Sequence, residues 1–465
     1  MKQKLDSMSD SDLKKIEELE ALAKDILEQR KASKKRRPIV IEFCGTPKAG
    51  KTSCLSALNL FLKRNGFKTR LVTERASICP VGDKFSPLFN IWTSNSAIAQ
   101  LADYVAGSWR NLDVIICDRG IFDALCWFYW QKDSQYMSDE EHKVLSKYLT
   151  MDRFRSLIDI VYVFKVSEKS ALEREYKNLL TRKSGTIMNH RVIEAFNKSL
   201  DFAVKKYDRD FRKIEQIDTS CIDQNQVGYK VTRQILQTLS DLTEENIAYL
   251  DRKDVIQFEN RDIWKSEDWP ERNFLKLKYE KRTTVEDDET KIQPLPIVIL
   301  FDPNNRSVLV AKKHQKGVSK GSPESGKVVT YFGGHVRDDD EFAAGSDANF
   351  DRTCHYALTR ELYEELGVTL NPLISNPLFI WLKNNPRSMK HLAVACVFYT
   401  DLDNLRIRLS PDEFVQRSGN SESGKIINIE KLEDSKFEDW SRICLRELLG
   451  IDRSEEFTFY RLDTD

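Results

Sequence analysis

Short apolar runs alternate with longer helical patterns through the first half of the chain. Runs of strand length occur at 39–44, 68–73, 113–118, 158–164 and 213–217. Between them, apolar residues recur at helical spacing, most clearly at 53–65, 88–109 and 227–242. This alternation predicts an α/β fold with a parallel, doubly wound sheet.

The second half of the chain shows a different pattern. Two apolar runs, 295–301 and 307–311, flank an Asp-Pro-Asn-Asn turn and predict a β-hairpin. A further strand is expected at 328–332, followed by a helix that Gly367 would terminate and a last helix at 435–449. We therefore expect a second domain.

The stretches outside these two patterns are predicted to connect or cover the domains. Residues 10–30 repeat Leu and Ile at helical spacing, which predicts an amphipathic helix packed on its own domain or on a second copy of the chain. The basic cluster 34–37 is more simply a solvated linker than a phosphate contact. Residues 246–291 are polar and irregular and indicate a linker segment.

Size and composition narrow the class of protein. A chain of 465 residues is expected to form about two to three domains. The 73 basic and 73 acidic residues balance, so charge gives no general argument for a nucleic-acid or membrane partner. The apolar runs fall well short of a membrane span. Nine scattered cysteines without a CxxC pair suggest a reducing, cytoplasmic location.

A phosphate-binding motif follows the first predicted strand. The sequence Gly-Thr-Pro-Lys-Ala-Gly-Lys-Thr fits GxxxxGK[ST] between a buried strand and a helix. Its glycines let successive N–H groups and the helix N-terminus point at a phosphate, while Lys51 reaches the β/γ oxygens and Thr52 a Mg²⁺. A glycine turn with a surface lysine is the plainer alternative, which the flanking strand and helix disfavour. The predicted nucleotide-binding residues are Gly45, Thr46, Pro47, Lys48, Ala49, Gly50, Lys51, Thr52 and Ser53.

Together with this motif, Glu74-Arg75 after the second strand and Asp118-Arg119-Gly120 after the third resemble the thymidylate kinase and deoxynucleoside kinase group. The resemblance covers about 38–240 and implies ATP as phosphoryl donor. It places Glu74 and Asp118 on the acceptor side and Arg119 at the phosphates. It also places Arg174 or Arg182 in a lid over the donor. The chain departs from the group in having Glu-Arg where those enzymes usually have Glu-Pro.

The same residues are compatible with either of two kinds of phosphoryl acceptor, a hydroxyl group or a phosphate group. Phosphoryl transfer needs positioning, a metal ion and positive charge on the equatorial oxygens. A hydroxyl acceptor would use Glu74 or Asp118 as a base, whereas a phosphate acceptor would use Arg75 and Arg119 as clamps. Asp118 ends an apolar strand, so its carboxylate needs a metal, a base role or a paired arginine. For Arg174, a surface ion pair is the plain alternative.

A second candidate site lies on the helix that Gly367 ends. Glu361, Glu364 and Glu365 are spaced i, i+3, i+4, so three carboxylates share one helical face. Crowded carboxylates repel unless cations neutralise them, and Mg²⁺ or Mn²⁺ would be a natural partner. An exposed acidic helix is the alternative, which the Gly-Gly strand end before the helix disfavours.

The run Arg360-Glu-Leu-Tyr-Glu-Glu-Leu-Gly-Val, with Gly334 before it, resembles the Nudix box of nucleoside-diphosphate-X hydrolases over about 292–465. The resemblance implies an α/β/α domain with a mixed sheet and places Gly334, Glu361, Glu364 and Glu365 at the metal, with Glu361 as ligand or base. Arg360 would orient a glutamate. The loop before Arg360 is longer than usual, so the first glutamate of the box is Glu341 or missing. A later metal ligand would be Glu422.

These observations lead to three hypotheses about function and to an expected division of the chain into four segments. The first is a bifunctional enzyme that transfers the γ-phosphoryl of ATP to a nucleoside-type or nucleotide-type substrate and cleaves a diphosphate linkage with Mg²⁺ or Mn²⁺. The second is a nucleotide-sensing ATPase switch whose Nudix-like module binds a ligand without turnover. The third, a kinase of nucleic-acid ends, rests on the basic cluster alone, and a nucleic-acid partner is not expected. The expected segments are 1–37 (helix, a possible homo-oligomer contact, and basic linker), 38–245 (kinase-like), 246–291 (linker) and 292–465 (Nudix-like).

Overall fold

The computed structural model describes residues 10–32, 38–108, 112–177, 186–221, 224–314, 324–416, 424–432 and 437–451. The chain divides into two compact units, 1–245 and 246–465. Three sequence predictions, the lid residue Arg182, the basic cluster 34–37 and the ligand Glu422, lie outside the described residues. Among the described residues, no helix is both long and apolar enough to cross a membrane.

The first unit contains, within its described residues, a sheet of five parallel strands in the order β2-β3-β1-β4-β5. The strands are β1 Ile39–Gly45, β2 Thr69–Val72, β3 Val114–Asp118, β4 Ile160–Lys165 and β5 Ile214–Asp218. The chain winds from β1 to β2 and β3 on one side and then crosses to β4 and β5 on the other. The order therefore reverses beside β1, where doubly wound sheets bind ligands at the carboxyl ends of their strands.

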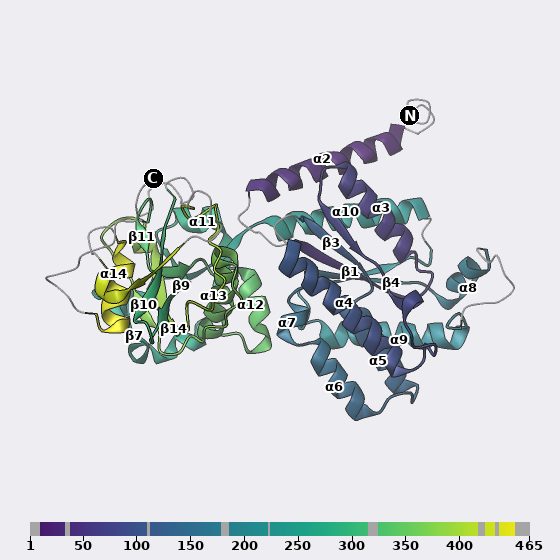
Figure 1. Ribbon diagram of the computed structural model, residues 1–465. Coiled ribbons are helices and arrows are strands. Elements are labelled where there is room, and N and C mark those ends of the chain that lie inside the picture. The colour runs from purple at the N-terminus through teal and green to yellow at the C-terminus, as the bar shows by residue number, and fades with distance from the viewer. Residues whose placement is uncertain are drawn as a thin grey trace. The chain divides into compact units, whose positions relative to one another are not determined.

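Helices cover both faces of this sheet (Figure 1). Alternate residues of β1 point to opposite faces: Ile41 and Phe43 pack toward α2, α3 and α10, whereas Val40 and Cys44 pack toward α4, α5 and α9. The helices are α2 Asp10–Ala32, α3 Lys51–Arg64, α4 Pro87–Ser108, α5 Ile121–Asp133, α6 Asp139–Leu149, α7 Asp152–Arg155, α8 Glu168–Lys177, α9 His190–Tyr207 and α10 Gln224–Thr243.

Helix α2 packs on α10 of its own unit. Its apolar positions Leu19, Ala23 and Ile26 are buried in the core cluster that also contains the buried residues of α3 and α10. The 3–4 spacing of these residues puts them on one helical face. The packing of the amphipathic helix on its own domain, one of the two predicted arrangements, is therefore observed.

The second unit is built around β9, the long strand Lys291–Asp302, in a mixed sheet. Strand β14 pairs parallel to β9, whereas β6, β10 and β12 pair antiparallel to it. The predicted hairpin is confirmed by the β9–β10 pairing. Besides β9, the strands are β6 Asn246–Asp251, β7 Ile263–Lys265, β8 Lys278–Lys281, β10 Ser307–Lys312, β11 Val328–Val329, β12 Tyr331–Gly333, β13 Leu378–Ile380, β14 His391–Tyr399 and β15 Lys425–Asn428.

Figure 1 shows α13 and α14 on opposite sides of these strands. The helix predicted to end at Gly367 is α13, where Gly367 adopts a left-handed φ of 69° and its N–H donates to Tyr363 O at 3.0 Å. The predicted final helix begins at Asp439. The helices are α11 Arg282–Asp287, α12 Asp338–Ala344, α13 Phe350–Leu366 and α14 Asp439–Leu449.

The prediction of a linker at 246–291 is wrong. Strands β6 and β8 pair with each other, β6 also pairs with β9, and β7 adds to β13. Trp264 and Trp269 from this segment are buried, and both stack on or abut Phe379 of β13. The segment reads as irregular because its strands are short and separated by 3₁₀ turns, so no periodicity develops. Those turns include Arg252–Phe258, Ser266–Asp268 and Pro270–Phe274.

Candidate active sites

The loop between β1 and α3 has the backbone of a phosphate cradle. Gly45, Lys48 and Gly50 adopt positive φ values of 123°, 62° and 89°. A Cβ on Gly45 would lie 2.0 Å from the Phe164 carbonyl oxygen of β4, so only glycine fits there. The loop leads directly into α3 at Lys51, so the N-terminal amides of that helix face the same space.

Lys51 is held inside this loop. It is 6% exposed, and its ammonium donates to the carbonyl oxygens of Gly45 and Thr46 at 2.8 Å each. Burial, together with the nearby Arg119 charge, lowers the pKa of Lys51 to about 7. Thr52 lies on the open side, where its hydroxyl is 3.5 Å from Asp118 Oδ2. Lys51 therefore lies within the loop predicted to bind phosphate, and Thr52 and Asp118, the predicted metal ligands, lie next to each other.

Arg119 is fixed between two carboxylates. Its Nε lies 3.0 Å from Glu74 Oε1, and its NH1 lies 2.9 Å from both oxygens of Asp123. The residue itself adopts a positive φ of 65°, which directs the chain from β3 into α5. Asp123 also accepts a 3.3 Å hydrogen bond from the Gly45 N–H, so one carboxylate ties the arginine to the phosphate loop.

A third acid, Glu42, supports this arrangement from the middle of β1. Its side chain is fully buried and accepts the N–H groups of Phe122 and Asp123 at 3.2 and 2.9 Å, which caps the start of α5. Burial raises the pKa of Glu42 to about 8. A Cβ on Gly120 would lie 2.7 Å from the Glu42 carboxylate, so this glycine makes room for the cap. The sequence signal was present, since Glu42 is the one acid inside an apolar strand.

Arg174 reaches the loop from α8. It donates to the Lys48 carbonyl and to the Thr219 hydroxyl at 3.1 Å each. The Lys48 ammonium in turn pairs with Glu175 of the same helix at 2.7 Å. The structure therefore brings Arg174 beside the loop, and its role in a lid over the donor stays a prediction.

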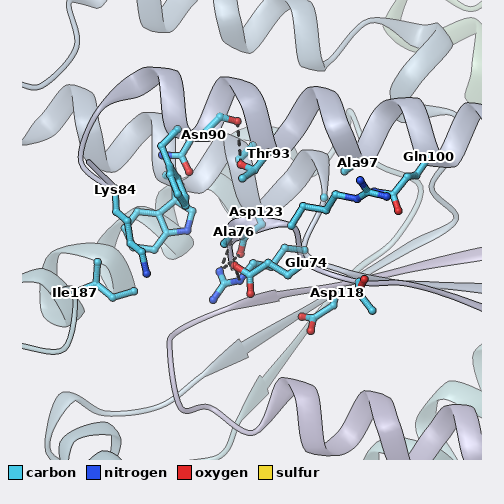
Figure 2. A pocket seen from close by; sticks show the side chains of 17 residues that line it. Glu74, Ala76, Lys84, Asn90, Thr93, Ala97, Gln100, Asp118, Asp123 and Ile187 are labelled. Carbon is cyan, nitrogen blue, oxygen red and sulfur yellow. Dashed lines mark hydrogen bonds and ion pairs between the residues drawn. The ribbon is translucent and has the colours of Figure 1, made fainter. Parts of the chain in front are cut away.

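Two cavities meet at Glu74, Asp118 and Arg119. The first, about 560 Å³, is lined by residues 47–54, Arg174 and Thr219, and falls in the range of roughly 300–1,000 Å³ typical of ligand pockets. The second, about 90 Å³, lies between α4 and α5 and is lined in part by Lys84, Thr93, Ala97 and Ile187 (Figure 2). Three polar side chains therefore stand between a phosphate cradle and a neighbouring pocket.

The smaller pocket combines aromatic walls with amides. Phe89 and Trp127 line it, and both are largely buried. Asn90 and Gln100 supply amide groups, and the buried Nδ2 of Asn90 has no hydrogen-bond partner among the described residues. A buried donor without a partner is costly unless a ligand satisfies it. This lining suits a flat ring that carries hydrogen-bond acceptors.

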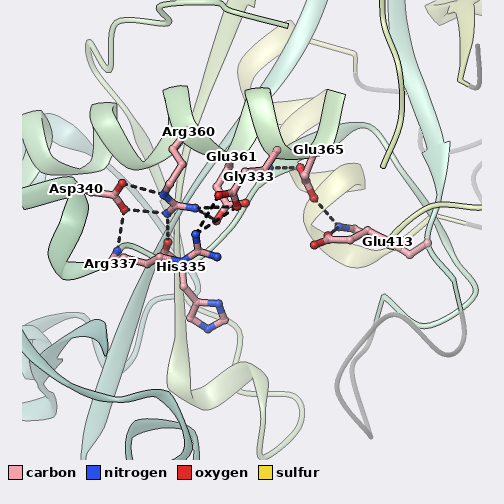
Figure 3. Close-up of polar contacts among 10 residues, drawn as sticks. Gly333, His335, Arg337, Asp340, Arg360, Glu361, Glu365 and Glu413 are labelled. Carbon is pink, nitrogen blue, oxygen red and sulfur yellow. Dashed lines mark hydrogen bonds and ion pairs between the residues drawn. The ribbon is translucent and has the colours of Figure 1, made fainter. Parts of the chain in front are cut away.

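The second candidate site is organised by Arg360 of α13. Its guanidinium donates to both oxygens of Asp340 at 2.8 Å and to the His335 carbonyl at 2.7 Å (Figure 3). Asp340 thus pairs with Arg360 through both carboxylate oxygens, whereas Glu341, the acid offered from the sequence for the first box position, is not among the carboxylates that contact Arg360. The neighbouring aspartate escaped notice because only glutamate was expected there.

Each predicted metal-binding glutamate is engaged by a basic side chain. Glu361 accepts a hydrogen bond from Arg360 at 2.6 Å. A Cβ on Gly334 would lie only 2.7 Å from Glu361 Oε1, so the glycine leaves room for this carboxylate. Glu364 accepts from Arg337 at 3.1 Å. The predicted face of three carboxylates therefore exists, but arginines lie against two of its members.

Glu365 has both oxygens occupied. Oε1 accepts from the Lys313 ammonium at 2.8 Å, and Oε2 accepts from the Gly333 N–H at 2.8 Å. Lys313 also lies 3.1 Å from Glu413, the residue drawn beside Glu365 in Figure 3. Burial by itself would lower the pKa of Lys313, but the charges of Glu365 and Glu413 outweigh it and hold that pKa well above its usual value.

These partners decide whether a resident divalent cation fits. A hard cation requires about six oxygen ligands with free lone pairs. Here each of the three glutamates already pairs with Lys313, Arg337 or Arg360, and the described residues contain no group of three acidic, His or Cys side chains arranged to hold a metal ion. The donor set does not fit. Sequence reasoning missed Lys313 and Arg337 because contacts across 52 and 27 positions leave no local pattern.

The molecule is thus an α/β protein with a doubly wound parallel sheet in its first unit and a mixed sheet in its second. No family model and no curated protein matches the chain. Among solved structures, Tm1382, provisionally described as a Nudix hydrolase, is similar at 23% identity and a TM-score of 0.33 over 45% of this chain and 100% of its own. Deoxyadenosine kinase from M. mycoides is similar in two structures.

One of these kinase structures contains the product dCMP and a flexible dCDP, with 20% identity and a TM-score of 0.34. The other contains dCTP, with 18% identity and a TM-score of 0.33. Each covers 43% of this chain and 100% of the kinase chain. Because these identities and TM-scores are low, the fold assignment rests on strand order and connectivity, and the function on the site geometry.

Proposed function

We propose that the first unit is a kinase that transfers the γ-phosphoryl group of ATP to a hydroxyl group of a nucleoside-type molecule. The observation that carries this proposal is the meeting of two cavities at Glu74, Asp118 and Arg119. One cavity has the amides and lysine that bind phosphates, and the other has aromatic and amide walls. A transfer reaction needs donor and acceptor pockets that share the reacting position.

The residues divide between donor and acceptor. On the donor side, the loop amides, Lys51 and Arg174 would bind the phosphates of ATP, and Thr52 with Asp118 would hold Mg²⁺. The metal ion would supply neutralisation of charge on the transferring phosphoryl group. On the acceptor side, Glu74 lies beside Arg119 and would accept the proton of the attacking hydroxyl.

A hydroxyl acceptor is favoured over a phosphate acceptor by the state of Arg119. Its guanidinium already faces Glu74 and Asp123, so its charge is compensated before any substrate binds. A phosphate acceptor would meet those two carboxylates as well as the arginine, and like charges repel. A neutral nucleoside meets no such repulsion.

The test is product formation from ATP, Mg²⁺ and a panel of nucleosides and nucleoside monophosphates, read by mass spectrometry. We expect nucleoside monophosphate from at least one nucleoside, loss of this product in Lys51→Ala, and its retention in Lys63→Ala, an exposed lysine of the same helix. Phosphorylation of monophosphates alone would contradict the hydroxyl acceptor. No transfer to any acceptor, with ATP hydrolysis intact, would favour the ATPase switch.

For the second unit, we propose that it binds a diphosphate-type ligand without turnover, the alternative to Mg²⁺-dependent hydrolysis. The ion pairs on Glu361, Glu364 and Glu365 support it, because carboxylates held by arginine and lysine are poor ligands for a metal that must activate water. Incubation with nucleotide sugars and dinucleoside polyphosphates in Mg²⁺ tests it. Release of phosphate or nucleoside monophosphate that Glu364→Gln abolishes would establish the hydrolase instead.

A further inference from the structure

We propose that the Lys313 ammonium occupies the cation position of the carboxylate cluster in the second unit, so that the cluster works without a divalent metal ion. The inference deepens the proposed ligand-binding role of this unit and rests on it. It makes one chemical claim: Lys313 fills a place that a divalent cation would take if the lysine were neutral and apolar.

Lys313 lies in a buried pocket formed by two carboxylates and an aromatic ring. The residue is 6% exposed, and its ammonium lies 2.8 Å from Glu365, 3.1 Å from Glu413 and 4.4 Å from the centre of the Phe414 ring. Two carboxylates and an aromatic face are a favourable surrounding for a compact ammonium group. The lysine follows the last residue of β10, where a bridge to Phe414 fixes its backbone.

The position is set by the same elements that present the carboxylates. Glu365 is fixed from its other oxygen by the Gly333 N–H at the end of β12, so its Oε1 points at the lysine. An ammonium and a divalent cation compete for the same lone pairs, and a buried carboxylate pair left without either is strongly unfavourable. Removing the lysine charge therefore leaves the negative charge of Glu365 and Glu413 without a counter-charge, which favours binding of a cation there.

The experiment measures Mn²⁺ binding to the full chain without nucleotide, from loss of the electron paramagnetic resonance signal of free Mn²⁺. The proteins are wild type, Glu365→Gln, Lys313→Met, the double variant Lys313→Met/Glu365→Gln, and Lys312→Met. Lys312 is the matched control, because it is the preceding residue of β10 and its side chain alternates to the other face.

We expect wild type, Glu365→Gln and Lys312→Met to bind Mn²⁺ alike. Lys313→Met should gain one site at least tenfold tighter than any in wild type, and the double variant should lose it. Mn²⁺ should also raise the melting temperature of Lys313→Met and leave that of wild type unchanged. If Lys313→Met does not fold, Lys313→Gln replaces it, since glutamine keeps a donor toward Glu365 without the charge.

Two outcomes overturn the inference. Wild-type Mn²⁺ binding that Glu365→Gln removes would show that a metal already takes the position. A folded Lys313→Met or Lys313→Gln that gains no site would show that the lysine does not hold it. The hydrolysis assay tests the ligand-binding proposal independently of the Lys313 assignment. Turnover in a protein without a Glu365-dependent Mn²⁺ site would refute ligand binding without turnover and leave the assignment of Lys313 to the cation position unaffected.

Discussion

Raising the pH above neutrality is expected to weaken binding of ATP to the first unit. Lys51 is buried among backbone carbonyls, and burial together with the Arg119 charge lowers its pKa to about 7. Above that pH, the unliganded loop contains a mostly neutral lysine. A bound polyphosphate places negative charge on the same amine and restores its protonation, so binding takes up a proton.

The size of the effect follows from the two protonation states. If the free lysine titrates at about 7 and the phosphate-bound lysine stays charged, Kd rises by about 25-fold between pH 7.5 and pH 9. The last ionisation of a phosphate group lies near pH 6, about 1.5 units below this window. The charge of ATP is therefore nearly constant across it, and the change belongs to the protein.

Isothermal titration calorimetry with a non-hydrolysable ATP analogue and Mg²⁺ measures both quantities. Kd gives the pH dependence, and repeating the titration in buffers of different ionisation enthalpy gives the number of protons taken up. Lys51→Arg is the control: its guanidinium stays charged, so its affinity is expected to be lower and independent of pH. A wild-type Kd that is flat from pH 7.5 to 9, with no proton uptake, would show that Lys51 is already charged in the free loop.

The same lowered pKa has a consequence for stability. The unfolded lysine titrates near its usual value of 10.5 and the folded one at about 7, so the unfolded chain binds more protons between these pH values. The contribution of Lys51 to the free energy of unfolding therefore rises with pH from about 7 to 10.5 and is fully present above the unfolded pKa.

Three further outcomes are expected. Gly45→Ala should abolish ATP binding and lower the melting temperature, because its Cβ would lie 2.0 Å from the Phe164 carbonyl oxygen, and calorimetry with a melting curve checks both. Arg119→Lys should reduce kcat about a hundredfold in steady-state assays, since one ammonium cannot keep both of the arginine's carboxylate contacts. Lys313→Met should lower the free energy of unfolding in urea by about 3–5 kcal/mol, and adding Glu365→Gln should recover part of that loss.

The first site could be predicted in outline because its signals are local. The phosphate loop needs glycines at fixed spacing between a strand and a helix, and every one of these features is adjacent in the sequence. Asp118 and Arg119 follow the end of a buried strand, which parallel sheets bring to the same edge as the loop. Of the two acids that fix Arg119, Glu74 was identified from the sequence and Asp123 was missed. Glu42, which caps the start of α5, was missed as well, because both residues act where α5 packs against β1 and neither belongs to a motif.

The second site could be predicted only in part for the opposite reason. The helical spacing of the three glutamates fixes their common face, but of the three basic residues that face them only Arg360 lies on the same helix. Lys313 directly follows β10 and Arg337 directly precedes α12, and only the closure of the mixed sheet brings them to α13. The prediction for segment 246–291 failed for the same reason. Its strands are short and show no apolar pattern of their own, and they are defined by pairing with distant strands such as β9 and β13.

The two sites differ in how charge is compensated, and this difference explains why we assign them different chemistry. Lys51 donates to carbonyl oxygens, which carry no net charge, so its loop gains by binding an anion. Lys313 faces two carboxylates, so its charge is satisfied within the fold. A buried charge without a counter-charge is unstable until a ligand supplies one, whereas a paired charge resists displacement. We therefore propose phosphoryl transfer for the site of the first lysine and metal-free ligand binding for the site of the second.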